Sequence, residues 1–183
     1  MLASLSTLEY AQWTTALVVA ICAGIFDWRS RRIPNWLTVS GAAAGIAVNT
    51  IVNHWAGLRA AVLGMLLGLA LLLPFVLIKS LGAGDWKLAG ALGACLGSRF
   101  LLATLMCAIL VAGVMALALV IAKGQLRQTA RNAVRMLAAL FSLRMPGAEV
   151  SLDNPESAKI PFGVALALAV IVCAIGVAMG KVH

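Results

Sequence analysis

Two aspartates differ from the other charged residues because long apolar segments lie directly beside them. Asp27 follows the first apolar segment, and Asp85 opens another within GAGDWKLAGALG. An acid in or beside a membrane-spanning segment costs free energy unless it faces water or a protein interior. The other four acids lie at a predicted membrane boundary or in a polar segment: Glu9, Glu149, Asp153 and Glu156. Asp27 and Asp85 are therefore the candidates for chemistry.

Two carboxylates a few ångströms apart do not both ionise easily, so such a pair shares a proton near the working pH. One oxygen can then take a proton from water while another donates one to a peptide carbonyl, as in aspartic proteases. Without a Ser/His or Cys/His set in the sequence, this is the hydrolytic chemistry that the residues support best. The structural alternative is that Asp85 caps a helix and that Asp27 pairs with Arg29 or Arg31. From composition alone the two interpretations are equally good.

The elements that must position these acids are membrane helices. The 183 residues are 63% hydrophobic and 11% charged, with a mean hydropathy of +1.03. This exceeds the roughly half-apolar composition of soluble domains, so lipid must be part of the solvent. We expect a single all-α membrane domain over residues 1–183, a bundle of six transmembrane helices near 8–26, 35–53, 58–78, 85–98, 100–122 and 160–180. The segment 85–98 is the shortest, at about 21 Å.

Basic residues set the expected orientation. With the amino terminus outside, eleven lysines and arginines fall in inside loops and three (Arg59, Arg99 and Lys181) fall outside. This bias follows the positive-inside rule and would be lost if 85–98 did not cross. Asp27 and Asp85 then lie on the same, cytoplasmic face of the inner membrane. The first apolar segment has basic residues after it and none before it, which is the reverse of a cleavable signal peptide.

Small residues crowd the predicted helices in three G-x-x-x-G pairs, Gly41/Gly45, Gly64/Gly68 and Gly93/Gly97. Such pairs allow close approach of helix backbones in lipid, so we expect a compact bundle. The sequence does not indicate which helices touch.

The only long polar excursion covers residues 124–159, a predicted cytoplasmic loop. Arg127, Arg131 and Arg135 share one helical stripe opposite apolar residues, which predicts a basic amphipathic helix lying along the head groups. Docking of a substrate's charged tail is the less favoured alternative.

Other binding functions have little support in the sequence. Cys22, Cys95, Cys107 and Cys173 form no Cys-x-x-Cys pair, and the two histidines are isolated, so we expect neither a metal nor another cofactor. The net charge of +8 fits contact with anionic membrane lipid, and no nucleic-acid motif accompanies it.

Three motifs carry a resemblance to a known family. DWRSRRIPN fits Asp-x-Arg-x-x-x-Ile-Pro-Asn, GAGD fits Gly-x-Gly-Asp with a lysine two residues on, and IPFGVALAL at 160–168 is similar to a Pro-Tyr/Phe-Gly segment that opens a last helix. Together they resemble the prepilin peptidases, which are membrane aspartic proteases. The resemblance implies removal of the short basic leader from prepilin-like precursors at the cytoplasmic membrane face.

The resemblance also implies roles for individual residues. Asp27 and Asp85 would be the catalytic pair, and Gly82 and Gly84 would shape the site. Lys87 would be a supporting charge beside Asp85. The remaining matches to the motifs are supporting residues: Arg29, Pro34, Asn35, Pro161 and Gly163.

One departure separates the chain from the longer family members, which carry an amino-terminal domain with paired Cys-x-x-Cys motifs. Because such cysteines are absent from this sequence, we expect no N-methyltransferase activity and a similarity to the short, peptidase-only branch that serves tight-adherence (Flp-type) pili. Two other functions remain open: a non-enzymatic scaffold or pilus-assembly factor with structural aspartates, and a small transporter with a proton relay. The transporter would need acids nearer the bilayer centre.

Overall fold

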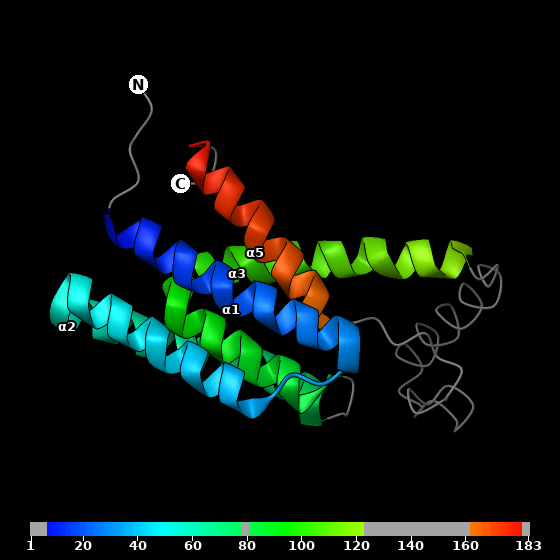
Figure 1. Cartoon of the computed structure of the whole chain (residues 1–183), viewed down its shortest axis with the longest axis horizontal. Helices are drawn as coiled ribbons and strands as arrows, with labels where there is room; N and C mark the ends of the chain where they lie inside the picture. The colour runs from blue at the N-terminus through cyan, green and yellow to red at the C-terminus, as the bar shows by residue number, and fades with distance from the viewer. Residues whose placement is uncertain (1–6, 78–80, 123–161, 181–183) are drawn as a thin grey trace, which may run out of the picture. The chain divides into compact units, whose positions relative to one another are not determined.

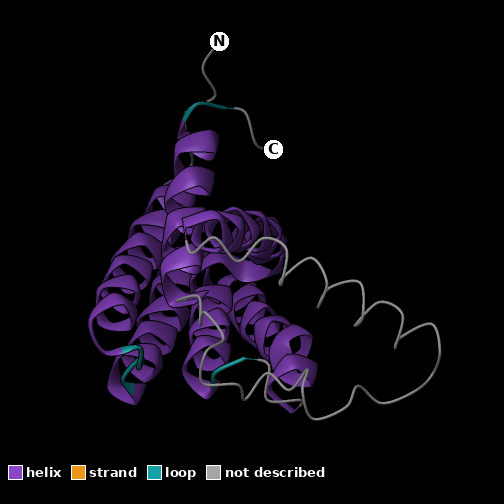
Figure 2. Cartoon of the chain, turned by 90° about the vertical axis from the view of Figure 1, so that its right-hand side faces the viewer, coloured by secondary structure: helices purple, strands orange, loops and turns teal. Residues whose placement is uncertain are grey.

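The computed structural model describes residues 7–77, 81–122 and 162–180, and every regular element in them is a helix (Figures 1 and 2). The helices are α1 (Thr7–Ser30), α2 (Asn35–Leu77), α3 (Ala83–Ala122) and α5 (Phe162–Ala178). α1, α2 and α3 are long and apolar enough to cross a membrane, whereas α5 is a shorter apolar helix. The predicted amphipathic helix within 124–159 lies outside the described residues.

The chain forms two compact units, one of Met1–Val111 with Pro161–His183 and one of Ala112–Ile160. Of the second unit, the structure describes the last turns of α3, where Val114, Leu117 and Ile121 are exposed. Both candidate aspartates belong to the first unit, to which the following description refers.

α2 consists of two helical halves separated by a break. Asn53 and His54 have non-helical backbone angles, and His54 has a φ of 46°. The break falls at the boundary expected between the predicted helices at 35–53 and 58–78.

The contacts of α2 with α3 show that its halves run in opposite directions. In order along α2, the contacting pairs are Asn35 with Lys87, Gly45 with Cys95, Gly64 with Gly93, and Leu69 with Trp86. The partner's position in α3 rises before the break and falls after it. The first half of α2 is therefore parallel to the start of α3, and the second half is antiparallel to it.

α3 is also interrupted, at Gly97, whose φ of 70° and ψ of 176° lie outside the helical region. This separates the segments expected at 85–98 and 100–122. Every residue in 88–97 is buried. A helix that is apolar on all sides belongs in the interior, so the shortest predicted segment is the central helix of the unit.

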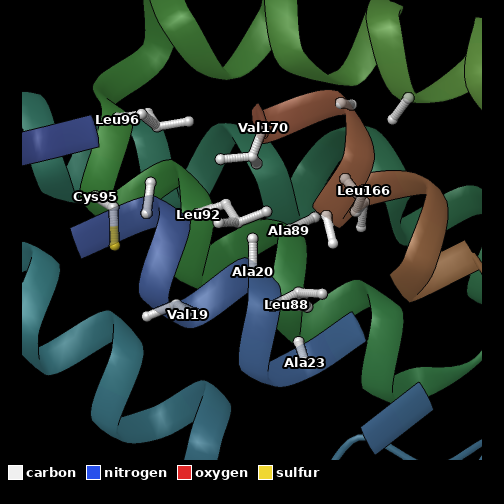
Figure 3. Packing of buried hydrophobic residues seen from close by; sticks show 14 of the residues in the cluster. Val19, Ala20, Ala23, Leu88, Ala89, Leu92, Cys95, Leu96, Leu166 and Val170 are labelled. Atoms are coloured by element: carbon white, nitrogen blue, oxygen red, sulfur yellow. The ribbon is translucent and has the colours of Figure 1, made fainter. Parts of the chain in front are cut away.

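The core forms where α1, α3 and α5 meet (Figure 3). It is built from small and branched side chains, among them Ala20, Ala23, Leu88, Leu92, Leu166 and Val170. Glycines bring the backbones together: Gly64 lies against the Gly93 carbonyl, and Gly68 lies against that of Ala89. Two of the three sequence pairs thus join the second half of α2 to the central helix, as expected of small residues at helix interfaces in lipid.

One end of this unit collects several helix termini. α1 ends there, α2 and α3 begin there, and the start of α5 lies against the last turns of α1 through Gly163 and Asp27. We call this the aspartate end. The breaks at His54 and Gly97 lie at the other end of the central helix.

Candidate active site

An open cavity of about 330 Å³ lies at the aspartate end. Its lining comes from the end of α1, the connection to α2 and the start of α3: Asp27, Arg31, Arg32, Ile33, Gly82, Ala83, Gly84 and Asp85. The two candidate aspartates, which are far apart in the sequence, therefore face the same space. Gly82 and Gly84, which the resemblance assigns to the shaping of the site, also line this cavity.

Asp27 is held from behind by α5. Its side chain is only 6% exposed, and its Oδ2 accepts a hydrogen bond from the backbone N–H of Gly163 at 2.9 Å. A Cβ on Gly163 would lie 2.9 Å from the same oxygen, so only glycine leaves room for this contact. The first turn of a helix has backbone N–H groups without partners in the helix, and a carboxylate is a favourable acceptor for them.

Asp85 lies in the first turn of α3 and is less constrained. Its Oδ1 is buried and has no hydrogen-bond partner among the residues that the structure describes. A Cβ on Gly82 would lie 3.2 Å from Oδ2, and one on Gly84 would lie 3.2 Å from the Cβ of Ile33. Gly82 thus allows the chain to pass close to this carboxyl group, and Gly84 allows close packing against Ile33. A buried polar atom without a partner is unusual in a folded protein and calls for an explanation.

The other predicted site residues that the structure describes lie at the same end of the unit. Lys87 makes a different contact from the one that the family resemblance implies. Lys87 Nζ donates to Asn35 Oδ1 at 2.9 Å, which joins α3 to the start of α2. Arg29 is exposed in the last turn of α1, and Pro34 is partly buried just before α2. Pro161 lies outside the described residues.

Sequence reasoning missed two features of this end of the unit. Arg31, which the sequence suggested only as an ion-pair partner of Asp27 in the structural alternative, lines the cavity with the aspartates, and so does Arg32, although the family motif singles out neither. The indole N–H of Trp86 donates to the Leu69 carbonyl at 2.7 Å and so fixes α3 against the second half of α2. The signal for the arginines was their position about one helical turn after Asp27 in the sequence.

The arrangement fits proton transfer between two carboxyl groups and a water molecule. The carboxyls come from two helices, face one open cavity, and are partly removed from solvent. Among the residues that the structure describes, no group of three His, Cys, Asp or Glu side chains is placed to hold a metal ion. A purely structural role for Asp85 in the first turn of α3 would leave its unpartnered oxygen unexplained.

Comparison with known proteins gives one match. The model of the Type IV leader peptidase family matches residues 14–119, which include both aspartates and leave out α5. No curated protein matches the chain, and no solved structure matches it.

Proposed function

The chain belongs to the type IV leader peptidase family, and we propose that it is an aspartic endopeptidase that removes the short basic leader from prepilin-like precursors. Family membership indicates a peptidase and implies prepilin-type substrates. The proposal adds the catalytic groups, Asp27 and Asp85. The observation that carries it is the common cavity in which these two carboxyls meet.

In the proposed reaction, an anionic aspartate takes a proton from water, and the water oxygen attacks the scissile carbonyl carbon. The protonated partner donates its proton to the carbonyl oxygen. The aspartate that took the water proton then donates it to the scissile nitrogen, and the C–N bond breaks. The other aspartate takes a proton back from a hydroxyl of the tetrahedral intermediate, and the carboxylic acid released gives its own proton to the amine through water. The leader is released with a new carboxylate, and the mature chain has a new amino terminus.

The hydrogen bond from Gly163 would keep one Asp27 oxygen in a fixed position. The other Asp27 oxygen and the Asp85 carboxyl would then hold the water between them. Fixed geometry of this kind contributes to catalysis because it lowers the entropy cost of bringing the reacting groups together.

We further propose six membrane crossings with the aspartate end at the cytoplasmic face. The reversal at Asn53–His54 and the break at Gly97 support it, since they divide α2 and α3 near the expected boundaries. The positive-inside bias supports the orientation. The substrate's hydrophobic helix would lie in the membrane and present the bond before it at the interface. Assignment to the peptidase-only, Flp-type branch remains a prediction from the cysteine positions.

The test is cleavage of a cognate prepilin by the purified full chain. The wild type should shorten the precursor, which mass spectrometry would locate just before the hydrophobic segment. Asp27→Asn and Asp85→Asn should leave it uncut while the protein stays inserted and folded. Processing by both variants at the wild-type rate would instead favour a scaffold with structural aspartates.

A further inference from the structure

Arg31 has a backbone conformation that its side chain disfavours. It follows the last residue of α1 with a φ of 50°, and its N–H donates to the Asp27 carbonyl at 2.9 Å. This is the left-handed position that commonly ends a helix, and glycine is the usual residue there. Strained backbone in a folded protein is a reason to ask what the side chain does.

Arg31 and Arg32 both line the cavity that contains Asp27 and Asp85, and both are exposed. Arg31 is close enough to Asp27 for the two charges to attract, but the hydrogen bond to Asp27 Oδ2 comes from the Gly163 N–H, and none from the Arg31 side chain is found among the described residues. The leader of the proposed substrate is basic, and two guanidinium groups would repel it. A ligand for them must be negative.

The proposed reaction makes such a ligand in this cavity. When the C–N bond breaks, the carbonyl carbon of the last leader residue keeps its own oxygen and gains the oxygen of water, and it becomes a carboxylate. A guanidinium binds a carboxylate through two parallel N–H···O hydrogen bonds. The new amine, in contrast, is positive and suits the aspartates.

We propose that Arg31 binds the carboxylate at the new carboxyl terminus of the cleaved leader. This inference rests on the proposed peptidase function. Arg31 is chosen over Arg32 because its N–H bond to Asp27 places it one helical turn from the catalytic carboxyl, in a conformation that glycine would adopt more easily.

The experiment compares two synthetic leader peptides that differ only at the carboxyl terminus, one a free acid and one an amide. Binding to the purified full chain in neutral-lipid nanodiscs is measured by fluorescence anisotropy, which requires no turnover. For the wild type, the acid should bind at least about tenfold more tightly, because a charge-assisted bidentate contact is lost in the amide.

Arg31→Gly is the decisive variant. It should bring the ratio of acid to amide affinity close to one, while its thermal stability should not fall, because glycine accepts a φ of 50°. Arg32→Gly is the matched control, since Arg32 lines the same cavity and follows directly in the sequence, and it should keep most of the preference. Arg31→Lys should keep part of it.

Several results would overturn the inference. Equal binding of acid and amide by the wild type would do so, as would an undiminished preference in Arg31→Gly. An effect of Arg31→Gly on leader binding that appears only in vesicles with anionic lipid would assign the arginine to head groups instead. Failure of the wild type to cut prepilin would refute the proposed peptidase, and the acid-to-amide ratio would still be measured.

Discussion

Two buried polar groups lie at opposite ends of the central helix, and they differ in how well their hydrogen bonds are satisfied. At the aspartate end, Asp85 Oδ1 has no hydrogen-bond partner within the described part of the chain, and both aspartates line a cavity. Near the other end, the side chain of Asn49 is fully buried and accepts a hydrogen bond from Gln12 Nε2 at 2.6 Å. We call this second group the amide pair.

The amide pair donates hydrogen bonds to backbone carbonyls near the break in α3. Asn49 Nδ2 donates to the carbonyls of Gly45, Ala94 and Cys95 at 2.9–3.0 Å. Ala94 and Cys95 lie just before Gly97, where α3 is interrupted, and the amide gives both of their carbonyls a donor from another helix. With its hydrogen bonds made, the amide pair fits a structural role, whereas the proposed function assigns the unpartnered Asp85 carboxyl to a ligand.

The largest predicted effect tests the aspartate end. Asp27→Asn and Asp85→Asn should each slow leader removal by roughly a thousandfold or more, and the double variant should be no slower, because groups that act as a unit are not additive. Cleavage rates and thermal unfolding in the same detergent would measure this. A double variant slowed by the product of the two single effects would contradict a shared mechanism.

The next prediction concerns the support of Asp27 by α5. Gly163→Ala should lower kcat by roughly ten- to a hundredfold, because the new Cβ would displace the carboxylate from its catalytic position. Gly24→Ala is a matched control: its Cβ would meet Ala167 Cβ at 3.0 Å in the same α1–α5 interface, away from the carboxyl. Equal losses in both variants would mean that helix spacing, not the carboxylate, is responsible.

The amide pair should show the opposite profile. Asn49→Ala should reduce the free energy of unfolding by about 1–2 kcal/mol, because three carbonyls and Gln12 lose their partner. The kcat of the folded protein should change less than twofold. Thr50→Ala, whose hydroxyl bonds only to Ile46 in its own helix, is the control. A large drop in kcat without a loss of stability would make the amide pair part of the catalytic machinery.

The sequence predicted much of the helical framework, because apolar composition and the residues that interrupt it indicate where helices begin and end. Apolar segments separated by Gly97 and by the residues around His54 gave boundaries close to the observed interruptions. α1 continues to Ser30, beyond the expected end at residue 26, so Asp27 lies within its last turns. Hydropathy does not detect this last turn of α1, because the residues after the apolar segment, Asp27 to Ser30, are mostly polar or charged.

The sequence could not predict which helices pack against each other. The G-x-x-x-G pairs predicted close approach, yet their partners depend on which helix faces are brought together in three dimensions. The amide pair was missed for the same reason, although Gln12 and Asn49 stand out as amides within apolar segments. Asp27 and Asp85 could be singled out from the sequence because an acid beside an apolar segment has few roles, and their catalytic role stays a prediction.

The smallest predicted effect concerns the link between Lys87 and Asn35, which joins α3 to α2 beside the cavity. The resemblance implies that Lys87 acts as a charge beside Asp85, whereas the structure gives its Nζ to Asn35 Oδ1. If the hydrogen bond is what matters, Lys87→Met and Asn35→Ala should each reduce kcat/KM by about threefold, since a partly exposed contact contributes little.

The double variant separates the two roles of Lys87. If the lysine acts through Asn35, the double variant should also lose about threefold, because the second change removes a contact that is already broken. If it acts as a charge on Asp85 independently of Asn35, the losses of the two single variants, whatever their sizes, should multiply. Lys87→Arg sharpens the distinction, since it keeps the charge but changes the geometry of the hydrogen bond. Full activity of Lys87→Arg, together with multiplied losses in the double variant, would assign Lys87 to the electrostatics of the aspartate pair. A threefold loss in Lys87→Arg, in both single variants and in the double variant would assign Lys87 to the positioning of α3.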